Sequence, residues 1–166
     1  MDDPNETQRL QPALLDRLTD NAPDALKEKR SDRVIDVHRL RDIVQRDLAW
    51  LLNTNNHETL IDIKAFPNVA RSVINYGVRE VAGEIATADR AEEIRKMMRQ
   101  AIIRFEPRID ADTLDVTIRV EEKDNQSVIA YDIHADMWAQ PLPLELYLRS
   151  EVNLATGQLK LERGRA

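Results

Sequence analysis

The change in hydrophobic period on either side of Pro107 is the feature that most constrains the fold. Before this proline, apolar residues recur every three or four positions, and after it they alternate one by one. Steps of three and four place residues on one face of a helix, whereas alternation places them on one face of a strand. Helices followed by consecutive strands predict an α+β domain, with N-terminal helices packed on one face of a C-terminal antiparallel sheet.

The clearest predicted helix occupies the residues just before Pro107. Asp89 and Glu92 form an Asp-x-x-Glu capping pattern at its start, and Pro107 ends it. Its apolar face comprises Ile94, Met97, Met98, Ala101, Ile102 and Phe105. We expect Ile94, Met98, Ile102 and Phe105 to face the sheet at the centre of the core.

Two further helices are predicted upstream. Asp36 is a candidate N-cap for a helix whose apolar face comprises Val37, Leu40, Val44, Leu48 and Leu51. In the stretch "FPNVARSVINYG", Pro67 suits a first helical turn and Gly77 suits a left-handed C-terminal cap. Val69, Val73 and Ile74 would share one face of that helix.

The C-terminal part predicts strands separated by turns. Alternation begins at Leu114, resumes at Ile129 after "KDNQS", and resumes again at Leu144 after "QPLP". After "NLATG", a last short strand surrounds Leu159 and Leu161.

We divide the chain into three parts. Residues 1–20 contain a short docking helix with leucines at 10, 14, 15 and 18, and residues 21–34 form a charged linker. Residues 35–166 form the main domain. Dense charge without apolar period predicts that residues 1–9 and roughly 20–33 are mobile in the isolated protein.

Composition excludes several function classes. The net charge is −6 and aromatics make up 4% of the residues, which argues against binding to nucleic acid. There is no cysteine, no apolar run long enough to insert in a membrane and no basic leader, so we expect a cytoplasmic protein. His38, His57 and His134 lack metal-ligand spacing, and no glycine-rich phosphate loop occurs, so no metal or cofactor is expected.

The tripeptide Glu106-Pro107-Arg108 is the main candidate site. Pro107 disfavours helical geometry at Glu106, so Glu106 and Arg108 should point to the same side. Three interpretations stay open: a solvent-exposed pair, a charged clamp for a partner, or a pair satisfied inside the monomer. Glu106 could also be the acid of a glycosidase, but no second carboxylate is identified as its partner.

Three stretches carry a family resemblance. "RSVINYG" (71–77), "AIIRFEPRI" (101–109) and "LRSEVNLATGQL" (148–159) resemble, in order and spacing, the TssE family of type VI secretion baseplate proteins. That family is related to the sheath-initiator protein of contractile phage tails. The leucine-rich stretch "LQPALLDRL" also resembles the TssE N-terminus, and the resemblance covers nearly the whole chain.

The resemblance implies a structural protein rather than an enzyme. It would bind the baseplate wedge proteins TssF, TssG and TssK, initiate polymerisation of the TssB–TssC sheath, and reside in the cytoplasm where the baseplate docks at the inner membrane complex. Glu106, Pro107 and Arg108 would serve baseplate attachment. The alternative is a lysozyme-like glycoside hydrolase, a label that some family descriptions carry.

Sheath initiation would require an open sheet edge to which a neighbour adds a strand. Charged side chains normally guard such edges before assembly. The candidates for that task are Arg119, Glu121, Glu145, Arg149, Glu151, Lys160 and Glu162. The sequence does not indicate which strand is the open edge.

Overall fold

The structure, a computed structural model, describes residues 13–19, 23–24, 37–119, 127–138 and 143–164. The predicted cap Asp36, the "KDNQS" turn up to Gln126 and most of the predicted linker lie outside these residues. The proposed domain boundaries and the mobility expected of the N-terminal segments therefore remain predictions.

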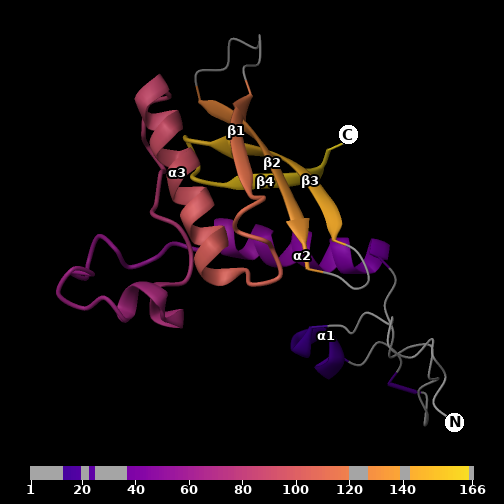
Figure 1. The fold of residues 1–166 in the computed structure, drawn as a ribbon. Coiled ribbons are helices and arrows are strands. Elements are labelled where there is room, and N and C mark those ends of the chain that lie inside the picture. The colour runs from indigo at the N-terminus through magenta and orange to yellow at the C-terminus, as the bar shows by residue number, and fades with distance from the viewer. Residues whose placement is uncertain (1–12, 20–22, 25–36, 120–126, 139–142, 165–166) are drawn as a thin grey trace, which may run out of the picture.

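The sheet is a four-stranded antiparallel meander (Figure 1). Its strands are β1 (Asp115–Arg119), β2 (Val128–Met137), β3 (Leu144–Asn153) and β4 (Leu159–Arg163). Strand order in the sheet follows chain order, so β1 and β4 are the two edges. With the helices upstream, this confirms the predicted α+β class.

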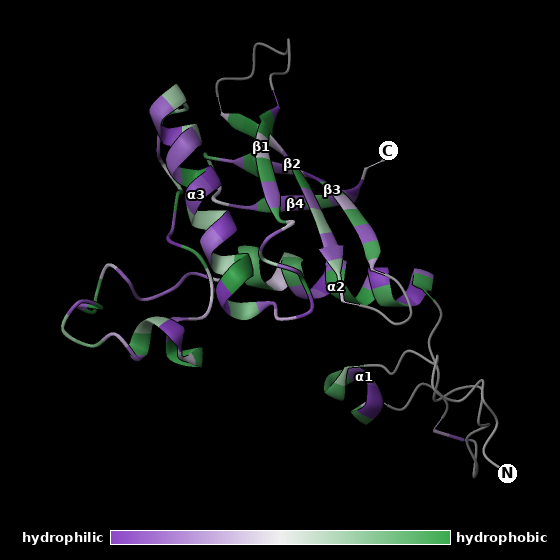
Figure 2. Ribbon diagram, viewed as in Figure 1, coloured by the Kyte–Doolittle hydropathy of each residue, from purple (hydrophilic) through white to green (hydrophobic). Residues whose placement is uncertain are grey.

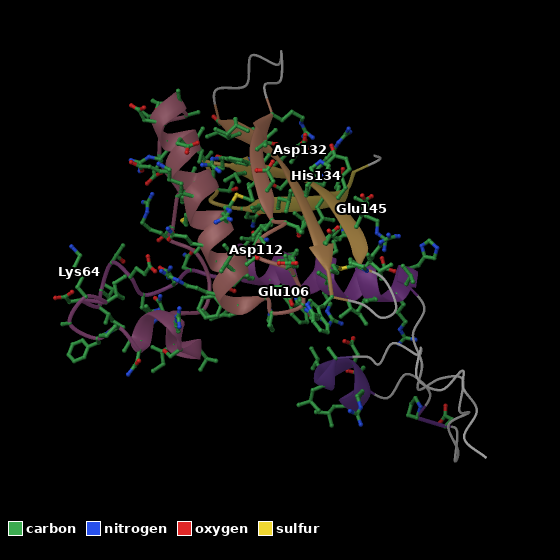
Figure 3. All side chains as sticks on the ribbon, in the orientation of Figure 1. Lys64, Glu106, Asp112, Asp132, His134 and Glu145 are labelled. Atoms are coloured by element: carbon green, nitrogen blue, oxygen red, sulfur yellow. The ribbon has the colours of Figure 1, made fainter. Side chains whose placement is uncertain are left out.

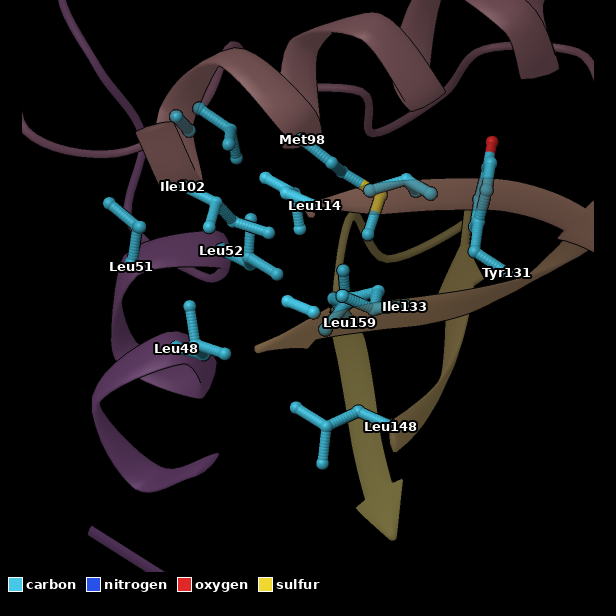
Figure 4. Close-up of a cluster of buried hydrophobic side chains, with 14 of the residues drawn as sticks. Leu48, Leu51, Leu52, Met98, Ile102, Leu114, Tyr131, Ile133, Leu148 and Leu159 are labelled. Atoms are coloured by element: carbon cyan, nitrogen blue, oxygen red, sulfur yellow. The ribbon is translucent and has the colours of Figure 1, made fainter. Parts of the chain in front are cut away.

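Two long helices pack with the sheet, α2 (Val37–Leu52) and α3 (Ala88–Phe105). Helix α3 runs beside β1 and α2 beside β4. The predicted faces of both helices are largely confirmed, because Leu48 of α2 and Met98 and Ile102 of α3 are almost fully buried with Tyr131 and Ile133 of β2 (Figure 4). Phe105 is only partly buried at the margin of this core.

The start of α3 differs from the prediction. The helix begins at Ala88, and its N-cap is Thr87, whose side-chain oxygen accepts a hydrogen bond from the Arg90 backbone N–H at 3.2 Å. Asp89 therefore lies in the first turn, where its negative charge still suits the helix dipole. The Asp-x-x-Glu pattern placed the cap two residues too late because the threonine performs the same function.

The connection between α2 and α3 is not helical as predicted. It contains two single 3-10 turns, η3 (Val69–Arg71) and η4 (Val73–Asn75), and projects from the body (Figure 1). Val73 is 86% exposed and Ile74 is 60% exposed, so the apolar face predicted for this segment is wrong. Figure 2 shows hydrophobic residues along this projection.

The leucine-rich segment contains the short helix α1 (Leu14–Leu18). Its leucines at positions 14, 15 and 18 are all exposed, and its Asp16 faces the body. Among the described residues, no helix combines the length and apolarity that crossing a membrane requires.

Candidate functional site

The Glu-Pro-Arg turn begins at Glu106, the C-terminal cap of α3. The backbone N–H of Glu106 still donates to Ile102 at 2.9 Å, but its φ of −119° and ψ of 82° have left the helical region, as Pro107 requires. The carbonyl of Glu106 then accepts from Ile109 N–H at 3.2 Å, which closes a tight turn. Glu106 is buried, Pro107 is exposed and Arg108 is intermediate.

Glu106 and Arg108 point to the same side and bind each other. Arg108 donates from Nε to Oε1 of Glu106 at 2.6 Å and from Nη2 to Oε2 at 2.5 Å. The Arg108 backbone N–H also donates to Oε1 at 3.2 Å. The side chain of Glu106 is only 7% exposed, so the interpretation as a solvent-exposed pair is wrong. This is a bidentate, charge-assisted pair that fixes both side chains.

A second carboxylate completes the environment of Arg108. Asp47 of α2 accepts from Arg108 Nη2 at 2.6 Å, so the turn is tied to a helix 61 positions away in the chain. Hydrogen bonds from Arg108 to Glu106 first, and then to Asp47, raise the pKa of the guanidinium. Arg108 is therefore a permanent cation shared between two anions.

The charge pairing continues from α2 to α1. Arg46 binds Asp47 at 2.8 Å and reaches Asp16 of α1 at 2.7 Å. The hydrogen bond from Arg46 lowers the pKa of Asp16. The result is an alternating series of charges that we call the ion-pair chain: Asp16, Arg46, Asp47, Arg108 and Glu106. It connects the N-terminal helix, α2 and the Glu-Pro-Arg turn.

The Asn-Tyr-Gly stretch lies beside this site. The ring of Tyr76 packs edge-to-face on Phe105, the residue before Glu106, with ring centroids 5.3 Å apart. Burial first, then the charges of Asp47 and Glu106, raise the pKa of Tyr76. Two of the three stretches that carry the family resemblance, 71–77 and 101–109, are thus neighbours in space.

Asn75 and Gly77 fix the projecting connection. The Asn75 side chain, fully buried, accepts from the His57 N–H at 3.2 Å and donates to Glu58 at 3.2 Å. Gly77 has a φ of +114°, and a Cβ there would lie 2.1 Å from the Thr54 carbonyl oxygen. The positive φ confirms the expectation for Gly77. Gly77 comes after the 3-10 turn η4, however, and not after the α-helix that was expected there.

The turn is also bonded directly to the sheet. The Arg108 carbonyl accepts from the Trp138 N–H at 2.7 Å, and the Asp136 carbonyl accepts from the Asp110 N–H at 2.9 Å. These bonds flank an antiparallel bridge between Ile109 and Met137 at the end of β2. The Glu-Pro-Arg turn is therefore bonded to α2 and to the end of β2, and Figure 3 shows Glu106 at the end of α3.

The sequence identified part of this site. It predicted that Glu106 and Arg108 share a side, but it did not identify Asp47, Arg46 or Asp16 as partners. Arg46 and Asp47 are consecutive polar residues on a helix with many others, so only their contacts in the fold distinguish them. The residues next to a helical position in the sequence do not indicate that its side chain faces the end of another helix.

The arrangement does not support hydrolytic or metal chemistry. Both carboxylate oxygens of Glu106 are bound to Arg108, so this carboxylate is engaged in an ion pair and is not presented to a substrate. The described residues contain no group of three side chains able to hold a metal ion. His134 instead stacks on Tyr147 across the sheet, with ring centroids 4.1 Å apart.

Comparison with known families decides what this architecture is. Residues 38–142 match the family model described as baseplate wedge protein gp25. The match extends from the start of α2 to the residues before β3 and includes the Glu-Pro-Arg turn. The chain belongs to the baseplate wedge protein gp25 family. No curated protein and no solved structure matched the chain.

Membership establishes a structural component of a contractile injection machine. The gp25 family is structural and non-enzymatic, and it binds baseplate wedge and sheath proteins. The family assignment overturns the glycoside hydrolase alternative, and the pairing of Glu106 with Arg108 gives the physical reason. The expected baseplate role is confirmed at the level of the family.

Proposed function

We propose that this chain is the TssE component of a type VI secretion baseplate. In that role it binds the wedge core of TssF, TssG and TssK, and it starts polymerisation of the TssB–TssC sheath. It would act in the cytoplasm, where the baseplate docks at the inner membrane complex. The three stretches that resemble TssE support this choice among gp25-like proteins, and two of them form the site around Glu106.

The observation that carries the proposal is the rigid presentation of the Glu-Pro-Arg turn. Glu106 is buried, but Pro107 is exposed and the Arg108 side chain is 28% exposed. The ion pairs with Glu106 and Asp47 fix the guanidinium before any partner arrives. A preorganised surface loses less side-chain entropy on docking, which favours binding. We assign wedge-core binding to Pro107 and the accessible edge of Arg108, with Glu106 as the residue that positions them.

The test compares two arginines of equal exposure. Arg104 lies one turn before Arg108, is also 28% exposed and also pairs with a glutamate, Glu58. We expect Arg108→Ala to weaken capture of the full chain by purified TssF–TssG at least tenfold, and Arg104→Ala to leave capture unchanged. Melting curves of both variants separate binding from folding.

Pro107→Ala provides an independent check. It removes exposed ring surface without removing either charge, so folding should be nearly unaffected while capture by TssF–TssG weakens. Normal capture by both Arg108→Ala and Pro107→Ala, with native melting, would reject wedge-core binding through this turn. Failure of the unmodified chain to bind either TssF–TssG or TssB–TssC would reject the TssE assignment itself.

A further inference from the structure

The two edges of the sheet expose different sets of main-chain groups. Along an antiparallel strand, the N–H and C=O groups of alternate residues point toward and away from the neighbouring strand. The carbonyl of Val116 accepts a hydrogen bond from Arg95 of α3, and the carbonyl of Leu161 accepts one from Gln45 of α2. These bonds show at which residues the main-chain N–H and C=O groups point away from the sheet. On β1 these are the even-numbered positions Val116 and Ile118, and on β4 they are Leu159, Leu161 and Arg163.

Two carboxamides, Gln45 of α2 and Asn53 just after its end, cover the β4 edge at Leu159 and Leu161. Asn53 donates from Nδ2 to the Leu159 carbonyl at 2.8 Å, and its Oδ1 accepts from the Leu159 N–H at 2.8 Å. Gln45 donates to the Leu161 carbonyl at 3.1 Å. Asn53 thus makes the same reciprocal pair of hydrogen bonds that a neighbouring strand would make. Strand addition at β4 would have to break this pair.

Helix α3 covers the β1 edge only in part. Arg99 donates from Nε to the Leu114 carbonyl and Arg95 donates from Nη1 to the Val116 carbonyl, each at 3.3 Å. A guanidinium has donors but no acceptor, so it cannot satisfy an outward N–H. The outward N–H groups of Val116 and Ile118 need an acceptor that these arginines do not offer. The Ile118 side chain is also 38% exposed, although the alternating pattern predicted that it lies on the covered face of the sheet.

Arg99 adds a preference for charge. Its guanidinium contacts the carbonyls of Ala111 and Leu114, and within the described part of the chain no carboxylate lies at ion-pair distance from it. Arg95, in contrast, is already paired with Glu92 at 2.7 Å. A strand added at β1 would supply N–H groups to the Leu114 and Val116 carbonyls and release Arg99, whose charge then favours an acidic side chain.

We propose that β1 is the edge that receives a partner strand, and that this strand carries a carboxylate facing Arg99. The partner is an extended segment recognised through its main chain. The inference rests on the proposed function, because it takes the sheath pair TssB–TssC as the source of the strand. It adds the identity of the edge, and it assigns to Asn53 and Gln45 the role of blocking strand addition at Leu159 and Leu161 of the opposite edge.

Amide hydrogen exchange tests the choice of edge directly. The full chain would be measured alone and with purified TssB–TssC. We expect the Val116 and Ile118 amides to become at least tenfold slower to exchange in the complex, with no change at Leu159, Leu161 and Arg163. Binding with protection confined to β4 would overturn the assignment of β1 and leave the proposed function intact. Absence of any binding would overturn both.

Matched proline variants test the same point by mutation. Proline is tolerated on an edge strand where its missing N–H would have pointed outward. Ile118→Pro removes an outward N–H from β1, and Arg163→Pro does so from β4. We expect Ile118→Pro to weaken TssB–TssC binding at least tenfold, and Arg163→Pro to bind like the unmodified chain. Equal binding by both variants, with native circular dichroism, would overturn the proposal.

Charge reversal on α3 tests the preference for an acidic strand. Arg99→Glu places a carboxylate at the β1 edge, and Lys96→Glu makes the same change in net charge at a position that is 63% exposed. We expect at least a tenfold loss of binding for Arg99→Glu and less than a twofold change for Lys96→Glu. If the two variants lose binding equally, the effect is one of net charge and the acidic contact is wrong.

Discussion

Glu106 is the charged residue on which the site depends most. Its side chain is 7% exposed, and it neutralises Arg108 through two hydrogen bonds. The proline in the sequence indicated that Glu106 leaves the helix and that Arg108 follows on the same side. It did not indicate burial, because burial depends on Asp47 and on the end of β2, both distant in the chain.

Replacing Glu106 with alanine should destabilise the domain. The change leaves Arg108 partly buried with one remaining anion, Asp47, so we expect a loss of about 3 kcal/mol in the free energy of unfolding. Urea unfolding of the full chain measures this. Glu93→Ala is the control, because Glu93 lies on α3, the helix that ends just before Glu106, is 60% exposed and should change stability by less than about 0.5 kcal/mol. Equal effects would show that the Glu106 pair contributes no more than a surface contact.

Alanine substitutions at two glycines would distinguish the energetic cost of a positive φ angle from the cost of a steric clash. Gly77 and Gly83 both have positive φ, at +114° and +80°, but a Cβ at Gly83 would meet no atom within 4 Å. Gly83→Ala should therefore cost only about 1–2 kcal/mol, the penalty for a left-handed angle. Gly77→Ala adds a collision with the Thr54 carbonyl and should cost more than about 3 kcal/mol. Thermal unfolding of the two variants gives the comparison, and similar losses would contradict the close approach.

At the scale of elements, the sequence predicted correctly those helices and strands whose periodic apolar residues pack in the main core. The faces of α2 and α3 and the alternation in β2 and β3 follow the pattern because one side of each packs on the same core. The helix predicted for residues 67–77 was wrong because the conformation of this segment depends on specific hydrogen bonds. Asn75 binds the backbone of His57 and the side chain of Glu58, and these long-range contacts, not an apolar face, shape the two 3-10 turns.

Helix α1 should detach from α2 in acid. The folded-state pKa of Asp16 is lowered from its ordinary value of 3.8 by the hydrogen bond from Arg46. A lowered folded pKa means that the Asp16 contribution is fully present above pH 3.8 and is lost as pH falls through the lower, folded value. Amide exchange of residues 15–18, measured relative to that of α3, should accelerate below that pH.

Asp16→Asn is the control for the acid effect. This side chain carries no charge at any pH, so α1 should exchange faster at neutral pH and show no further acid-dependent change relative to α3. A short helix of this length has little stability of its own, so it depends on such contacts. Identical exchange profiles for Asp16→Asn and the unmodified chain would show that the Asp16–Arg46 pair does not hold α1.

Across the whole molecule, the fold separates a buried core from segments that expose apolar side chains. The core unites α2, α3 and the inner face of the sheet. The projecting connection and α1 contribute little to this core, and they contain exposed hydrophobic residues such as Leu18, Leu60 and Phe66. Sequence pattern alone cannot make this separation, because an apolar residue at helical spacing has the same signature in the core and on a projection.

Met98 and Val73 test this separation with the same substitution. Both occupy positions that sequence spacing assigned to the apolar face of a helix, but Met98 is 1% exposed and Val73 is 86% exposed. Met98→Asp places an unpaired charge in the core and should cost more than about 4 kcal/mol, enough to unfold the domain at room temperature. Val73→Asp should change stability by less than about 0.5 kcal/mol, since the carboxylate stays in water. Circular dichroism melts would show this contrast, and a native melt for Met98→Asp or an unfolded Val73→Asp would mean that the boundary between core and projection lies elsewhere.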